Sequence, residues 1–240
     1  MGVVLKRFNA YPSHKLESGP VSDVTRSDMT TVAIAKVGKG RRTQAERTEL
    51  SDKLIMRAAV RLIAKQGYFR TTLAQIGADA GYSGALISYR YGSKQGLLRA
   101  LMHRIINRFW DDQLHPAIEK RPGLEALYTW ADVYLNELSA RESRLRALYV
   151  LMGEALGPVP EIRKVFAEIN VSMRALVEGC IKRGIEDGTI HRKIDPVNEA
   201  ATCVAMVRGI AMQWLIDPGC FDLKTVREHV KATIRTNLIA

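Results

Sequence analysis

The chain has 240 residues, of which 47% are hydrophobic, so it is long enough for one large domain or two modest domains with a real core. Its charge is uneven: residues 1–110 carry 19 Lys and Arg against 7 Asp and Glu, whereas residues 111–240 carry 17 against 18. A net charge of +12 in the first part and −1 in the second predicts a module that binds a polyanion, joined to a module of another kind.

Several classes of function lack a signal in this sequence. The three cysteines form no CxxC pair, the five histidines show no HxxxH or HExxH spacing, and no glycine-rich nucleotide-binding loop is found. No segment reaches the ~20 apolar residues of a membrane span, and the start lacks the apolar core of a secretory signal. We therefore expect a cytoplasmic protein that is not an enzyme, with no metal, no cofactor and no membrane partner.

Residues 1–44 contain Pro, Ser, Gly and Thr without a sustained apolar period, which predicts a mostly disordered arm. The arm ends in the basic run KVGKGRR, in which Arg41 and Arg42 stand just before the first predicted helix. Such an arm is either a solvated tail or a segment that enters the minor groove of DNA. Translation from Met29 instead of Met1 is a further alternative.

The first helix is expected from residue 48 or 49 to residue 66, because apolar residues recur there at steps of three and four and Gly67 ends the pattern. Tyr68 and Phe69 follow, and we expect them to pack this helix against the next two.

Two short helices joined by a glycine-containing turn are predicted in the segment TTLAQIGADAGYSGALISYRYGSKQGLL, residues 71–98. Thr72, or Thr71 before it, caps a helix over residues 73–80, Gly81 ends that helix, and Ser83 caps a second helix to about residue 89. This is a helix-turn-helix pattern, whose second helix fits the DNA major groove. The pattern favours a nucleic-acid partner over a basic surface that only aids solubility.

A long helix is expected after the cap Ser93, ending at about His115 before Pro116. Five more helical patterns follow, over residues 124–139, 143–156, 161–187, 196–216 and 223–238, with Pro or Gly at the junctions. No alternating pattern typical of strands is found in the sequence. We therefore predict an all-α chain with a three-helix domain at 45–92 and a larger helical domain at 93–240.

Several motifs stand in a fixed order between Leu54 and Leu101: the Gly67 stop, the TT cap, the capping Ser83, the ISY run and an SK-x-x-LL start of the next helix. Together they resemble the TetR family of one-component transcriptional regulators. Weaker agreement follows in GIEDGTI, IDPVNEAA and QWLIDP. The resemblance implies a homodimer whose first domain binds a palindromic operator and whose second domain dimerises and holds an effector pocket.

The candidate DNA contacts are hydroxyls, cations and the first turn of the helix after Ser83, because these groups bind phosphate oxygens or lie near base edges. They are Arg41, Arg42, Thr71, Thr72, Ser83, Gly84, Ala85, Ser88, Tyr89, Arg90 and Lys94. For the threonines, capping alone is an alternative. The chain departs from the family where Arg90-Tyr91 replaces a frequent His-Phe pair and where Gly84 replaces a frequent basic residue, so fewer side chains can read bases.

Met and aromatic residues on the apolar helix faces of the second domain belong either to the core or to the pocket. The pocket candidates are Trp130, Tyr134, Tyr149, Met152, Phe166 and Met206. Arg208 stands alone among apolar residues in CVAMVRGIAMQW, and we expect it in a salt bridge or on the dimer surface rather than against a ligand.

These observations predict a ligand-responsive transcriptional regulator, in this family most often a repressor, that binds double-stranded DNA as a homodimer. A largely apolar small molecule is the expected effector, and helices 161–187 and 196–216 are expected to pair with their copies. The rival interpretations are an architectural DNA-binding protein without an effector and a helical enzyme with a fortuitous turn motif.

Overall fold

The computed structural model describes residues 43–140, 142–157 and 160–239, and these residues form helices and turns without a strand. The expected arm with Arg41 and Arg42 lies outside the described residues. The helices are α1 (Gln44–Arg70), α2 (Leu73–Ala80), α3 (Gly84–Tyr91), α4 (Lys94–Phe109), the π-helical η1 (Trp110–Leu114), α5 (His115–Ile118), α6 (Gly123–Ala140), α7 (Glu142–Glu154), α8 (Pro160–Glu186), α9 (Pro196–Ile216) and α10 (Leu223–Ile239). The predicted all-α class is confirmed.

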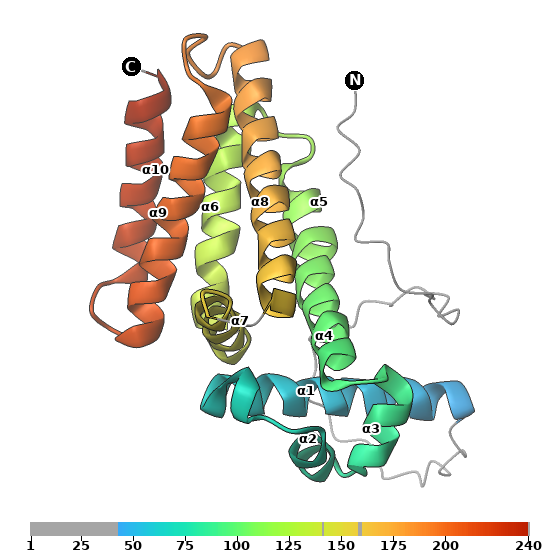
Figure 1. The fold of residues 1–240 in the computed structure, drawn as a ribbon. Coiled ribbons are helices and arrows are strands. Elements are labelled where there is room, and N and C mark those ends of the chain that lie inside the picture. Colours follow the sequence, from blue (N-terminus) through green and yellow to red (C-terminus); the bar gives the residue numbers. More distant parts are fainter. Residues whose placement is uncertain (1–42, 141, 158–159, 240) are drawn as a thin grey trace, which may run out of the picture.

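The helices form a base and an upright bundle (Figure 1). In the base, α1 lies across the end of the bundle and packs on α2, which packs on α3. In the bundle, α6 contacts α8, α9 and α10, and α8 packs along α9. The α4 helix rises from the base beside α8, and α7 packs on α1 at the lower end of the bundle. Two elements, α4 and α7, therefore connect the base to the bundle.

Hydroxyl caps set the starts of the helices in the base, as the sequence predicts. The Thr72 hydroxyl accepts from the Gln75 backbone N at 3.1 Å, and the Gln75 side chain accepts from the Thr72 backbone N at 2.9 Å. Ser83 caps α3 in the same way, its Oγ accepting from the Leu86 N at 3.1 Å. Gly81 ends α2 with φ +78°, a conformation that favours glycine.

The first helix begins earlier than predicted and is interrupted where predicted. Thr43 and Glu46 form a capping box that starts α1 at Gln44, several residues before the apolar stripe begins. Gly67 has φ +81° and breaks the helical path, so the remaining residues of α1 form a separate turn. Tyr68 is buried there, but Phe69 is 81% exposed, so the expectation that both aromatic rings pack inward is wrong for Phe69.

The sequence predicts that the long helix after Ser93 ends at about His115. In the structure the helical path continues through Pro116 to Ile118. Proline lacks an N–H, and in an α-helix its ring clashes with the carbonyl four residues earlier. In this chain the helix widens before the proline, since the His115 backbone N donates to the Trp110 carbonyl five residues back. The wider turn allows the helix to pass a residue that would otherwise break it.

Candidate nucleic-acid interface and ligand pocket

The second helix of the helix-turn-helix, α3, has one buried side and one exposed side. Ile87 is fully buried and anchors α3, whereas Ser83, Ala85 and Ser88 are exposed and Tyr89 is 90% exposed. The exposed side thus carries two hydroxyls, a small methyl side chain and an extended phenol. Groups of this kind contact phosphates and base edges without occupying much of the groove.

Gly84 holds α3 close to α2 instead of reaching outward. A Cβ atom at this position would lie 3.0 Å from the Ala74 Cα, so the two backbones nearly touch. Thr72 is exposed at the start of α2. Gly84 therefore belongs to the DNA-facing candidates only through its backbone, while Thr72 keeps a hydroxyl at the surface.

Arg90 and Thr71, two of the predicted DNA contacts, make contacts within the protein. Arg90 Nη1 lies 2.6 Å from Asp52 Oδ1 and 2.5 Å from Ser51 Oγ, which connects α3 to α1. Thr71 is 1% exposed, and its hydroxyl donates to the Gly67 carbonyl at 2.6 Å. Thr71 is thus a structural residue of the α1–α2 junction and leaves the set of DNA contacts, whereas Arg90 stays at the surface with one nitrogen engaged.

Lys94 and Glu154 both hold the turn that follows Gly67. Lys94 Nζ donates to the Phe69 carbonyl at 3.1 Å and lies 4.2 Å from the centre of the Tyr68 ring, and burial lowers its pKa. From the other side, Glu154 Oε1 and Oε2 accept from the Tyr68 backbone N at 3.0 and 3.2 Å. Because Glu154 is the last residue of α7, this turn joins α7, α1 and the start of α4.

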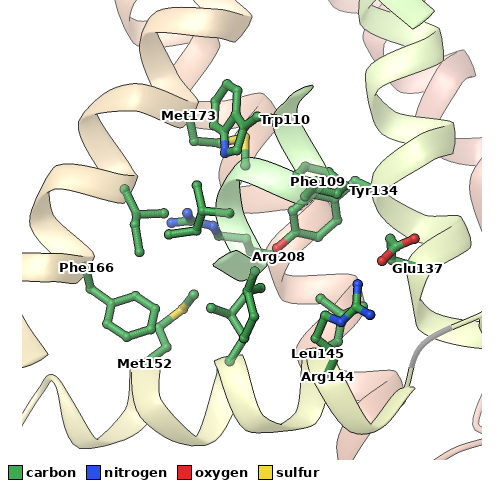
Figure 2. A pocket seen from close by; sticks show the side chains of 14 residues that line it. Phe109, Trp110, Tyr134, Glu137, Arg144, Leu145, Met152, Phe166, Met173 and Arg208 are labelled. Atoms are coloured by element: carbon green, nitrogen blue, oxygen red, sulfur yellow. The ribbon is translucent and has the colours of Figure 1, made fainter. Parts of the chain in front are cut away.

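A pocket lies among α4, η1, α6, α7, α8 and α9 (Figure 2). The empty space among its side chains is about 640 Å³ when the opening to solvent is included. The lining is mostly apolar and aromatic: Ile105, Ile106, Phe109, Trp110, Tyr134, Leu145, Leu148, Met152, Phe166, Ile169 and Met173, with the charged residues Glu137, Arg144 and Arg208.

The predicted pocket residues divide into three groups. Tyr134, Met152 and Phe166 lie in the wall. The Tyr149 hydroxyl lies behind the wall, 3.0 Å from the Tyr134 hydroxyl. Trp130 is fully buried in the core, and Met206 is not in the wall either, so the apolar period of a helix did not separate core from pocket.

Phe109 and Trp110 line the pocket although the sequence did not single them out as ligand contacts. The available signal was that Phe109 continues the apolar stripe of the long helix, which only predicts that this side is covered. Whether a cavity forms beneath this side of the helix depends on how α4 packs against the bundle. No local sequence pattern indicates this packing.

Arg208 lies in the pocket wall, and no salt bridge joins it to another residue of the described chain, so the expected salt bridge is not found there. Its Nη1 lies 2.6 Å from the amide oxygen of Asn170, and its Nε is buried without a hydrogen-bond partner among the described residues. Figure 2 shows the guanidinium among apolar side chains, between Trp110 and Met152.

Two negative findings concern only the described part of the chain. No group of three or more His, Cys, Asp or Glu side chains there could hold a metal ion. None of the described helices is long and apolar enough to cross a membrane.

Comparison with known proteins identifies both parts of the chain. Residues 55–101 match the family model of bacterial regulatory proteins of the tetR family, and residues 124–238 match the C-terminal model of BetI-type transcriptional repressors. The transcriptional regulator TtgR of Pseudomonas putida is 27% identical over 188 residues, covering 76% of this chain and 88% of the relative. The transcriptional repressor BepR of Brucella suis is 24% identical over 205 residues, covering 83% and 97%.

Solved structures of the same fold agree with this result. NalD, the secondary repressor of the MexAB-OprM multidrug efflux pump in Pseudomonas aeruginosa, superposes with a TM-score of 0.66 at 24% identity, covering 80% of this chain and 98% of NalD. A transcriptional regulator from Saccharomonospora viridis in complex with choline gives a TM-score of 0.69 at 22% identity, covering 81% and 98%. The helix-turn-helix, the helical bundle behind it and both family matches lead to one conclusion: the chain is a transcriptional regulator of the TetR family.

Proposed function

We propose that this regulator is a cytoplasmic repressor that binds a palindromic operator as a homodimer and is released by a largely apolar small molecule. The observation that carries the proposal is the exposed side of α3, which ends in the 90% exposed Tyr89, together with a pocket in the bundle above it. In this proposal residues 45–92 form the DNA-binding domain and residues 93–240 form the effector-binding and dimerisation domain.

The proposed operator contacts are Thr72, Ser83, Ala85, Ser88 and Tyr89, with Gly84 contributing its backbone. Their hydroxyls and the N-terminal N–H groups of α3 suit phosphate oxygens and base edges. Arg90 and Lys94 add positive charge beside this surface, and Arg41 and Arg42 add more from the preceding arm. Contacts to phosphates would then supply most of the affinity, since few side chains reach the bases.

The proposed dimer interface is supported by an apolar stripe on the outer side of α9. Exposed small and apolar residues recur there at steps of three and four: Val197, Ala201, Ala205, Gly209, Met212 and Ile216. On the adjacent helix α8, Val171 is exposed as well. A continuous exposed stripe of this length is typical of an interface, and a second copy of the same two helices complements it as a four-helix bundle.

The proposed release mechanism depends on the shared helices. Pocket residues lie on α4 and α7, and the first residue of α4 and the last residue of α7 contact the turn after Gly67. An effector that prefers a different arrangement of these helices would change the separation of the two α3 helices in the dimer. The expected coupling free energy is about 1–3 kcal/mol.

Operator binding is tested by selecting genomic DNA fragments with the purified full-length protein and deriving a consensus. We expect a palindrome, and we expect Ser88→Ala and Tyr89→Ala to weaken binding to it. Ser139→Ala, an exposed serine at the end of α6, is the matched control and should leave the affinity unchanged. Fragments without a consensus, and no small molecule that releases them, would favour the architectural alternative.

The dimer is tested separately by light scattering without DNA. We expect wild-type protein to be dimeric at micromolar concentration, with an interface of roughly 2,000 Å² or more. Met212→Glu should shift it to monomer, whereas Thr236→Glu on the exposed side of α10 should not. A monomeric wild-type protein would contradict the proposal.

A further inference from the structure

We propose that the pocket takes an amphipathic organic anion, whose acidic group pairs with Arg208 and whose apolar body lies against the aromatic and aliphatic wall. This inference rests on the proposed function, because it names the chemical class of the effector for the same pocket.

The first argument is the state of the Arg208 guanidinium. Guanidinium is always charged in proteins and carries five N–H donors. The contact to Asn170 uses one nitrogen and a neutral acceptor, and the buried Nε has no partner among the described residues. A charge held this way in an apolar wall is costly unless an anion completes it.

The second argument is that the surrounding contacts hold this guanidinium in place. The Arg208 carbonyl accepts from the Tyr149 hydroxyl at 3.1 Å, and that hydroxyl lies 3.0 Å from the Tyr134 hydroxyl, which ties α9 to α6 and α7. Asn170 fixes one Nη from α8. Contacts from four helices therefore fix the Arg208 backbone and one guanidinium nitrogen. The remaining N–H donors of the guanidinium are thereby oriented and can bind a carboxylate, sulfonate or phosphate.

The third argument is the charge balance and shape of the wall. Its charged residues are two arginines, Arg208 and Arg144, against the single carboxylate of Glu137. The excess positive charge favours an anion over a cation. Phe109, Trp110 and Phe166 supply large apolar surfaces on the remaining wall, which match an aliphatic or aromatic body rather than a small inorganic anion.

The test is titration of the full-length protein with three probes of equal chain length: decanoate, decanol and decyltrimethylammonium, each below its micelle concentration. Binding is followed by calorimetry and by intrinsic tryptophan fluorescence, to which Trp110 in the pocket wall contributes. We expect decanoate to bind about tenfold or more tightly than decanol, since a charge-assisted hydrogen bond is lost with the alcohol. The cationic probe should bind most weakly.

Matched variants assign the selectivity to Arg208. Arg208→Gln should bind decanoate and decanol with equal affinity, and Arg208→Lys should keep part of the preference because it keeps the charge without the fork. Arg174→Gln, an exposed arginine on α8, is the control and should behave as wild type. If Arg208→Gln does not fold, its decanol affinity is lost too, and the Arg208→Lys variant alone decides the assignment.

The outcomes separate this inference from the proposed function. Equal affinity of the wild-type protein for decanoate and decanol overturns anion recognition. Undiminished selectivity in Arg208→Gln, or in Arg208→Lys where Arg208→Gln does not fold, overturns the assignment to Arg208. Both outcomes leave operator binding untouched. Selective binding of decanoate that Arg208→Gln abolishes supports it, even where decanoate does not release the operator. In that last case, the release mechanism of the proposed function fails while the ligand class stands.

Discussion

The contact between Glu154 and the turn after Gly67 leads to a quantitative prediction for stability. Replacing Glu154 with Ala removes the acceptor of the Tyr68 backbone N, which is held at 3.0 and 3.2 Å, and leaves this N–H without its carboxylate partner. A hydrogen bond to a charged group contributes about 1.5–3 kcal/mol when buried. Because Glu154 is half-buried and water can partly replace it, we expect a loss of about 2 kcal/mol.

For a chain of this length, this loss corresponds to a fall in melting temperature of about 4–8 °C. The melting temperature of Glu154→Gln should fall by about half as much, because the amide keeps one acceptor oxygen and loses the charge. Gly67→Ala should destabilise the same turn by another route, since φ is +81° and the added Cβ would lie 2.5 Å from Glu154 Oε1.

The measurement is thermal unfolding by circular dichroism at one fixed protein concentration, because dimerisation would make the melting temperature depend on concentration. Glu125→Ala is the matched control: this exposed glutamate on α6 forms a surface ion pair with Arg121 at 3.9 Å. Such pairs contribute little, so its melting temperature should change by less than about 2 °C. A Glu154→Ala protein that melts together with this control would refute the assignment of the contact.

Three further outcomes are expected. Burial raises the pKa of Cys180 to about 11 and that of Cys203 to about 12, so at about pH 8 a thiol reagent should modify only the exposed Cys220 in the folded protein; labelling that survives Cys220→Ser would contradict this. Arg90→Ala should weaken binding to all DNA sequences alike and lower the salt slope by about one unit per half-site, and a changed base preference at constant salt slope would argue against a phosphate contact. Deletion of residues 1–42 should leave folding and dimerisation intact, and it should reduce DNA affinity and flatten its salt dependence if the arm enters the minor groove; unchanged binding isotherms would identify a solvated tail.

Local chemistry made several helix boundaries predictable. Thr72 and Ser83 could be recognised as caps because each places a hydroxyl three residues before a backbone N–H, and the structure contains those bonds. Pro196 after Asp195 marked the start of α9 in the same way. A capping box, a proline or a glycine acts within one turn of the chain, so its effect can be recognised without the tertiary structure.

Contacts between distant segments account for what the sequence did not predict. Nothing near Arg90 indicates that Asp52, 38 residues earlier, accepts from it. The same holds for Glu154 and Tyr68, which are 86 residues apart. Arg208 was expected in a salt bridge or on the dimer surface, because burial of a charge demands a partner. Only the packing of α8 against α9 determined that its neighbour is the amide of Asn170. The pocket is equally a product of packing, since core and cavity residues share one helical period.

The π-helical segment η1 also corrects the angular phase of the helix that contains it. The buried residues Met102, Ile106, Trp110, Leu114 and Ile118 recur every four residues, and in a regular α-helix each such step turns about 40° past a full turn. Over four steps the stripe would move about 160° around the axis and point Ile118 away from the core. Hydrogen bonds to the fifth preceding residue give each residue of η1 a smaller rotation, which turns the stripe back between Trp110 and Leu114. The pocket wall on α4 and the surface of α5 that packs on α6 are thereby brought toward the same side of the helix.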